Sequence, residues 1–302
     1  MRSWSVSDTT HPDGRGGSVE TQIGTEADDD PLAVELNVDA ALMLATVAGI
    51  DSYPPVLALR PNIYLVEDRK RVHEHVGAQL AEVGVLVDGR VHPTVSHWLH
   101  CLHRPDMELV ARIVDTGLDG ETRGMLRISF VRAGEDHVLA LRDDDHVVFQ
   151  KVFHQGRGID TLASVLISAL GTVPALDFEP MSATFEQLDE VPADADERRT
   201  ALIELGAQPR TASALTRALD QVVRRAEILV IEHHDGGSVT PEVALSILDT
   251  LSGRVVVTPS RAMDGEMWST YLPGDDAAIQ RGVTALIDLL PAQSWFETSR
   301  TD

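Results

Sequence analysis

Residues able to carry out acid–base or metal chemistry gather in one short stretch, at His97, His100, Cys101 and His103. Side chains three or four positions apart share one face of a helix, so His97 is within reach of the Cys101 thiol. A zinc site would need three or four converging ligands, and leucines occupy the positions in between. No further residue in this stretch would orient His97 as a base. We therefore expect a polar helix face without a metal, and a buried thiol with a structural role.

A second candidate is His233-His234-Asp235, which is followed by two glycines. Such residues can form an acid–base site on a loop, but this composition is more typical of a solvated hairpin turn. The sequence contains no nucleophile elbow, phosphate loop, dinucleotide fingerprint or zinc-protease motif. The residues therefore predict a binding or structural protein without catalytic residues, metal or cofactor.

The overall charge restricts the possible partners. The 302 residues include 48 Asp and Glu against 25 Lys and Arg, which gives a net charge of −23. Phosphate contacts need clustered cations, so this excess disfavours nucleic acid and anionic membranes as partners. No apolar stretch approaches the roughly 20 residues that span a bilayer, so we expect no membrane insertion. The single cysteine suits a reducing compartment, and we expect a cytoplasmic protein.

The chain divides into a tail and a folded region. Residues 1–30 lack the apolar segment of a secretory signal and are rich in Ser, Thr, Gly and Asp, which predicts a disordered tail. Residues 31–302 are predicted to form a single domain of two halves, residues 31–173 and 174–302. The elements follow the same order in both halves, although sequence identity between them is low.

Hydrophobic periodicity predicts these elements. Helices are expected over residues 40–48, 67–83, 93–103, 160–170, 196–205, 211–225 and 276–290. Strands are expected over residues 56–59, 109–114, 125–131, 138–141, 147–153, 228–231, 244–248, 255–257 and 268–272, and residues 174–192 form a connector. Short turns between successive strands imply antiparallel pairing, and grouped helices and strands indicate the α+β class. We expect a central antiparallel β-sheet flanked by two helical bundles, related by a pseudo-twofold internal repeat.

Residues 244–274 resemble a known family. They read ALSILDTLSGRVVVTPSRAMDGEMWSTYLPG, similar to the C-terminal signature of the EspG family, D-T-x-x-G-R-V-x-V-x-P-S-R-x-x-D-G followed by S-T. The matching residues are Asp249, Thr250, Gly253, Arg254, Val255, Val257, Pro259, Ser260, Arg261, Asp264, Gly265, Ser269 and Thr270. The resemblance extends over about residues 34–295. A turn-forming segment followed by a strand also explains these residue types, so we expect most of them to maintain the fold.

The resemblance implies a cytosolic chaperone of mycobacteria. Such a protein binds the helical tip of the PPE subunit in PE/PPE heterodimers, keeps them soluble and directs them to a type VII (ESX) secretion system. Partner contact is implied for the loop between the second and third strands and for the C-terminal helical bundle. We place the loop at Arg132, Ala133, Gly134, Glu135, Asp136 and His137, and the bundle contacts at Leu202, Leu205, Leu215 and Leu219. Within the family, the resemblance favours the paralogue that serves the third ESX system.

Two other interpretations stay open. One is an enzyme whose site assembles from scattered residues such as His100, Cys101, His233 and Asp235. The other is a structural dimer without a client, and a client-free chaperone could itself form a homodimer. A polar pocket holding several histidines would favour the enzyme. An exposed apolar patch beside the loop at residues 132–137 would favour the chaperone.

Overall fold

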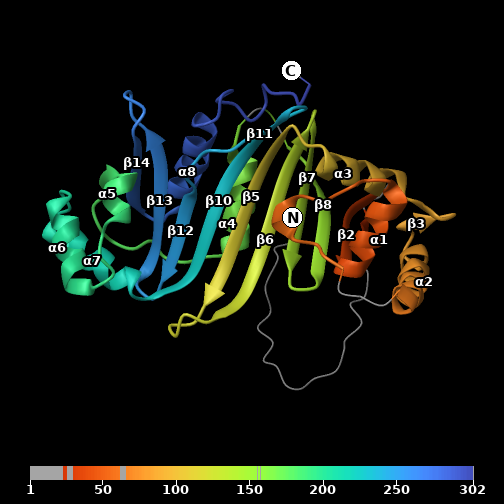
Figure 1. The fold of residues 1–302 in the computed structure, drawn as a ribbon, viewed down its shortest axis with the longest axis horizontal. Coiled ribbons are helices and arrows are strands. Elements are labelled where there is room, and N and C mark those ends of the chain that lie inside the picture. Colours follow the sequence, from red (N-terminus) through yellow and green to blue (C-terminus); the bar gives the residue numbers. More distant parts are fainter. Residues whose placement is uncertain (1–22, 26–29, 62–65, 155, 157, 302) are drawn as a thin grey trace.

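The structure, a computed structural model, describes residues 23–25, 30–61, 66–154, 156 and 158–301. One large sheet dominates it, with strand order β1-β2-β8-β7-β6-β5-β10-β12-β13-β14-β9, and β11 pairs with β10 (Figure 1). The strands are β1 (Ile23–Thr25), β2 (Pro31–Asn37), β5 (Met107–Thr116), β6 (Thr122–Ala133), β7 (Asp136–Asp143), β8 (His146–Val152), β9 (Met181–Thr184), β10 (Val222–His234), β11 (Gly237–Val239), β12 (Leu245–Thr250), β13 (Gly253–Arg261) and β14 (Met267–Pro273). Every pairing between these strands is antiparallel, which confirms the expected α+β class.

Eight α-helices accompany the sheet in the described part of the chain. They are α1 (Val38–Ala48), α2 (Val66–Glu82), α3 (Pro93–His103), α4 (Asp160–Leu170), α5 (Phe185–Asp189), α6 (Ala195–Glu204), α7 (Pro209–Leu219) and α8 (Asp276–Asp288). A short 3-10 helix, η1 (Pro55–Leu57), and a hairpin of β3 (Leu86–Val87) and β4 (Arg90–Val91) complete the elements. Across the residues that the structure describes, no helix combines the length and the apolar character needed to cross a membrane.

The two faces of the sheet are covered differently. On one face, which we call the closed face, α4 and α8 form a core with the middle strands, and Leu109, Ala111 and Ile113 of β5 are buried in it. On the other face, α1 and α3 cover the β2–β8–β7 end, and α6 and α7 cover the opposite end. The middle of that second face lies between the two groups of helices (Figure 1). We call it the open face; it is formed by Val110, Arg112, Val114, Met125, Arg127, Arg142, Arg225, Glu227 and Leu229, all exposed or half-buried.

Helix boundaries follow local signals in the sequence. Asn37 caps α1, because its side-chain oxygen accepts a hydrogen bond from the Ala40 N–H at 2.8 Å. Gly49 ends the same helix in the left-handed region, with φ of 72°. Helix α4 begins at Asp160, as the predicted range has it, with Ile159 in the cap position. The Asp160 carboxylate accepts a hydrogen bond from Gln280 of α8.

Three predicted elements are wrong. Residues 56–59 do not form a strand. Val56 and Leu57 belong to η1, which begins at Pro55, and the two prolines at positions 54 and 55 lack the backbone N–H groups that pairing in a sheet needs. The helix predicted over residues 211–225 ends at Leu219, and β10 begins at Val222, since pairing with β5 and β12 overrides the helical pattern. The connector at residues 174–192 contains β9 and α5, the latter begun by a capping box of Thr184 and Gln187.

The N-terminal region also holds structure that the sequence did not predict. Residues 31–37 form β2, which pairs with β8. Part of the predicted tail forms β1, which pairs with β2 along Ile23–Thr25. Asp30 accepts a hydrogen bond from the Thr94 hydroxyl at 2.7 Å. The remainder of the predicted tail, residues 1–22 and 26–29, lies outside the described residues.

Candidate partner-binding surface

The cluster around Cys101 has one feature that the sequence analysis did not foresee. His97 Nε2 lies 2.8 Å from Asp136 Oδ2 and 3.7 Å from Cys101 Sγ. A carboxylate therefore does accompany His97. However, thiol and carboxylate meet the same ring nitrogen, whereas a catalytic triad uses both nitrogens. Burial raises the pKa of Cys101 to about 11, the reverse of what a nucleophilic thiolate requires.

The neighbouring histidines bind the protein backbone. His100 Nδ1 lies 2.7 Å from the Ser96 carbonyl oxygen, and His103 Nδ1 lies 3.0 Å from that of Ser52. Each ring thus has a separate partner, and the three histidines do not converge. In the part of the chain that is described, no group of three or more His, Cys, Asp or Glu side chains is placed to hold a metal ion.

The segment His233-His234-Asp235 forms the predicted hairpin turn only in part. Asp235 lies in the exposed turn between β10 and β11, whereas His233 and His234 end β10, are half-buried and each pair with a buried glutamate. His233 Nε2 lies 3.1 Å from Glu108 Oε2, and His234 Nε2 lies 3.1 Å from Glu232 Oε1. Asp235 pairs with Arg104 and Arg300 on the rim of the sheet. These contacts hold strand ends together and leave the residues apart from Cys101.

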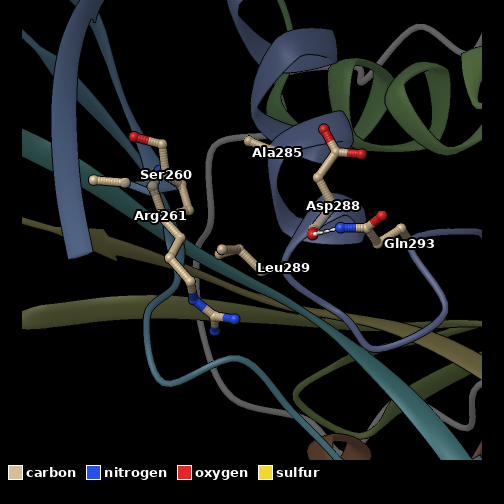
Figure 2. A pocket seen from close by; sticks show the side chains of 8 residues that line it. Ser260, Arg261, Ala285, Asp288, Leu289 and Gln293 are labelled. Carbon is tan, nitrogen blue, oxygen red and sulfur yellow. Dashed lines mark hydrogen bonds between the residues drawn. The ribbon is translucent and has the colours of Figure 1, made fainter. Parts of the chain in front are cut away.

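A hollow of about 500 Å³ lies between the end of β13 and α8. Figure 2 shows Ser260 and Arg261 on one side of it and Asp288 and Gln293 on the other. The Gln293 side-chain amide donates to the Asp288 carbonyl oxygen at 3.3 Å. The lining contains neither histidine nor cysteine, so it lacks the polar histidine pocket that the enzyme interpretation requires.

The predicted partner loop at residues 132–137 comprises the end of β6, the two-residue turn at Gly134 and Glu135, and the start of β7. Arg132 is 4% exposed and donates to the carbonyl oxygens of Trp295 and Thr298 and to Asp106. His137 is 3% exposed and accepts a hydrogen bond from Trp295 Nε1 at 3.1 Å. These two side chains therefore hold the C-terminal segment against the sheet.

The middle of the same turn faces solvent. Gly134 and Glu135 are exposed, and Ala133 and Asp136 are half-buried. Close by, Phe153 is 63% exposed, one residue beyond Val152, which pairs with His137. The turn thus offers a small mixed surface, in which Phe153 is the large apolar side chain.

The four leucines predicted from the C-terminal bundle contribute to the core beneath α6 and α7. Leu202 and Leu215 are buried, whereas Leu205 and Leu219 are half-buried and pack against the same core. The exposed apolar side chain of this bundle is Ile203, which follows Leu202 on α6. The structure therefore does not bring the bundle leucines and the 132–137 segment together. The segment joins β6 and β7 near the middle of the strand order, whereas α6 and α7 pack at the β12–β13–β14 end of the sheet (Figure 1).

The open face connects these two regions. Val110 of β5 lies opposite Leu229 of β10, and both are half-buried. Arg112 lies opposite Glu227 and donates to it at 2.6 Å. Apolar and charged side chains thus alternate in rows across the open face. Beyond it, the β5–β6 hairpin projects past the sheet, and its Leu118 is 64% exposed (Figure 1).

A family match shows what kind of protein presents this surface. The model of the EspG family matches residues 37–285. This chain belongs to the EspG family. One EspG relative, the ESX-3 secretion-associated protein EspG3 of Mycolicibacterium smegmatis, is 36% identical over 272 residues, which are 88% of this chain and 90% of that protein. The ESX-1 secretion-associated protein EspG1 of Mycobacterium marinum is 32% identical over 271 residues, covering 89% of this chain and 92% of that protein.

The fold of the EspG family is known from a solved structure. The Mycobacterium tuberculosis type VII secretion system chaperone EspG5, in complex with a PE25–PPE41 dimer, matches with a TM-score of 0.74 at 20% identity. The match covers 88% of this chain and 100% of the EspG5 chain. The arrangement of the large sheet and its helices is therefore that of EspG5.

The EspG signature spans β12, β13 and β14, and its residues in the β12–β13 hairpin have clear structural contacts. Arg254 donates to both oxygens of Asp249, at 2.6 and 3.0 Å, and both side chains are buried. The Thr250 hydroxyl donates to the Gly253 carbonyl oxygen at 2.8 Å. At Gly253, with φ of 135°, a Cβ atom would lie 2.8 Å from the backbone nitrogen of Leu176. These residues of the signature therefore hold the hairpin together.

Sequence reasoning missed the open face as a candidate surface. Its arginines stand at the polar positions of alternating strands, which is a visible signal, but alternation alone predicts only a solvated face. Which residues of different strands lie side by side depends on register, and register was not available from the sequence.

Proposed function

We propose that this protein is a cytosolic chaperone that binds PE/PPE heterodimers through the PPE subunit, keeps them soluble and directs them to a type VII (ESX) secretion system. The observation that carries the proposal is the match to the whole EspG5 chain, a chaperone solved with PE25–PPE41. Membership of the EspG family supports it. The separate partners of His97, His100 and His103 and the raised pKa of the Cys101 thiol argue against an enzyme.

We propose that the client contacts the side of the sheet that carries the open face. This region has half-buried apolar side chains such as Val110 and Leu229, with arginines and glutamates around them. Interfaces of this kind combine apolar anchors with a polar rim. The predicted contacts at residues 132–137 stay part of the proposal through their exposed members Gly134 and Glu135. On α6–α7, the half-buried Leu205 and Leu219 stay candidates, and we add their exposed neighbour Ile203.

Co-expression tests this function. The full chain, tagged, should co-purify with at least one PE/PPE pair encoded in the same genome, as a noncovalent complex that survives EDTA. Recovery of the chaperone alone with every such pair would overturn the proposal, and loss of the complex on chelation would point to a metal. In size-exclusion chromatography with light scattering, the client-free chain is expected to be able to form a homodimer that the client dissociates.

A substitution pair separates fold from contact in the C-terminal bundle. Leu215→Asp places a charge in the core and should unfold the bundle, at a cost of several kcal/mol. Ile203→Asp, on the exposed face of the same bundle, should leave the circular dichroism melting curve unchanged and weaken client binding. An Ile203→Asp variant that binds its client normally would remove α6 from the proposed surface.

We also infer that residues 31–173 and 174–302 are two copies of one structural pattern within a single domain. Outward from the β5–β10 pair the strands run β6, β7, β8, β2 on one side and β12, β13, β14, β9 on the other. On each side, the strand named last comes before the others in the sequence: β2 precedes β6, β7 and β8, and β9 precedes β12, β13 and β14. Superposing β5–β8 and α4 on β10, β12–β14 and α8 tests this, and a poor fit of α4 to α8 would contradict a pseudo-twofold repeat.

A further inference from the structure

Three arginines lie side by side on the open face. Arg112 of β5 is directly opposite Arg127 of β6, and Arg127 is directly opposite Arg142 of β7. Directly opposed residues of antiparallel strands project from the same face with their Cβ atoms about 5 Å apart. The register therefore places three positive charges in one row, which like-charge repulsion makes unfavourable in the absence of a compensating anion.

The chain itself supplies little compensation for this row. Glu227 continues it on β10 and pairs with Arg112. Arg142 donates to the carbonyl oxygens of Leu57 and Ala58, which carry no net charge. Among the described residues Arg127 has no carboxylate partner. Burial, and next the charges of Arg142 and Arg112, lower its pKa. In a chain of net charge −23, this row is thus a local positive excess with one carboxylate for three guanidinium groups.

The rows on either side carry apolar side chains. Val110 and Leu229 lie two residues along their strands towards one end of the face. Val114 and Met125 lie two residues towards the other end, in a row that Arg225 of β10 extends beside Val114. Rows two residues apart are separated by about 7 Å, close to the 5.4 Å pitch of a helix. A helix laid across the rows can therefore place an acidic side chain on the arginine row and apolar side chains on the neighbouring rows.

We propose that Arg127, framed by Arg112 and Arg142, binds a carboxylate side chain on the helical tip of the PPE subunit. This inference rests on the proposed chaperone function and specifies what the client must offer: an acidic residue flanked by apolar residues one turn away on the same helix face. The guanidinium group matches a carboxylate with two parallel hydrogen bonds. Binding would complete a charge row that the chain leaves unbalanced.

Isothermal titration calorimetry of the full chain with a co-purifying PE/PPE pair tests this. Arg127→Gln should weaken binding at least tenfold without lowering the melting temperature. Arg281→Gln, a matched change on the exposed side of α8, should leave the dissociation constant unchanged. Raising NaCl from 0.05 to 0.5 M should weaken binding by the wild-type chain much more than by Arg127→Gln, because the added salt screens the charge pair.

The outcomes distinguish the inference from the function on which it rests. If no PE/PPE pair binds the wild-type chain, both are overturned. If a pair binds and Arg127→Gln binds it equally well, the chaperone function stands and the carboxylate site is overturned. If inorganic phosphate binds in an Arg127-dependent manner while the client does not depend on Arg127, the row is a small-anion site. Restoration of Arg127→Glu binding by a client Asp/Glu→Lys change would identify the acidic residue and support the inference.

Discussion

Arginines on the two faces of the sheet differ in how their charges are balanced. On the closed face, Arg254 pairs with Asp249, Arg224 pairs with Asp115, and both arginines also donate to the Leu170 carbonyl oxygen at the end of α4. Each guanidinium there has its own carboxylate. On the open face, Arg112, Arg127 and Arg142 form a row with one glutamate, Glu227, and Arg225 lies in the next row. The closed-face arginines are balanced by carboxylates of the same chain, whereas the arginine row on the open face keeps an excess of positive charge.

The difference shows that burial decides whether a charged side chain needs an oppositely charged partner within the chain. A buried charge without a partner is strongly destabilising, so a group sealed under helices must be paired within the chain. A half-buried group on an uncovered face retains water, and the protein tolerates its excess charge. An imbalance on the uncovered side of a sheet is therefore informative about binding, and a balanced pair under helices is informative about stability.

Removing one partner of the buried pair should have the largest effect. Arg254→Met leaves Asp249 buried opposite an apolar side chain, and the free energy of unfolding should fall by about 3–5 kcal/mol, measured by urea denaturation. The double change of Arg254→Met with Asp249→Leu should recover part of that loss, since it removes both charges. Equal stability of the single variant and the wild type would show that the closed face does not depend on its ion pairs.

A second test uses pH at the other end of the closed face. Burial, and next the adjacent His154 ring, lower the pKa of His137 to about 4. Above pH 6.5 the ring is neutral in both states and its contribution to stability is complete. As pH falls from 6.5 towards 4, the unfolded chain takes up a proton that the folded chain does not, so about 3 kcal/mol at most is lost.

The control for this pH dependence is His137→Gln, which can still accept from Trp295 but does not titrate. The difference in unfolding free energy between wild type and variant should shift in favour of the variant as pH falls through this window. Carboxylates titrate in both proteins and cancel in the difference. Parallel stability curves would mean that His137 titrates alike in the folded and unfolded states.

The smallest effect on stability is expected on the open face. Arg127→Gln removes one of three adjacent positive charges, so the free energy of unfolding should change by less than about 0.5 kcal/mol, and relief of repulsion favours a small increase. Urea denaturation at low and high salt measures it, with the gain vanishing in high salt. A loss comparable to that of Arg254→Met would show that the two faces use their arginines in the same way.

Much of the local structure could be predicted from the sequence. Asn37, Gly49 and Pro93 set helix boundaries through capping, left-handed geometry and a fixed φ, all of which depend on near neighbours. The antiparallel class followed from the short turns between strands. The EspG signature could be read directly as a family resemblance, because it fixes many residues in one continuous segment.

Only the tertiary structure decided the rest. β10 could not be recognised from Val222 onwards, because its pairing with β5 and β12 overrides a helical pattern. Arg132 read as a loop residue, and its burial depends on a C-terminal segment more than 160 residues away. The arginine row needs three strands in one register. The sequence by itself determined what each segment can form, since that is set by local sterics and hydrogen bonding. Only the tertiary structure decided which charges end up adjacent, since that depends on pairings between distant segments.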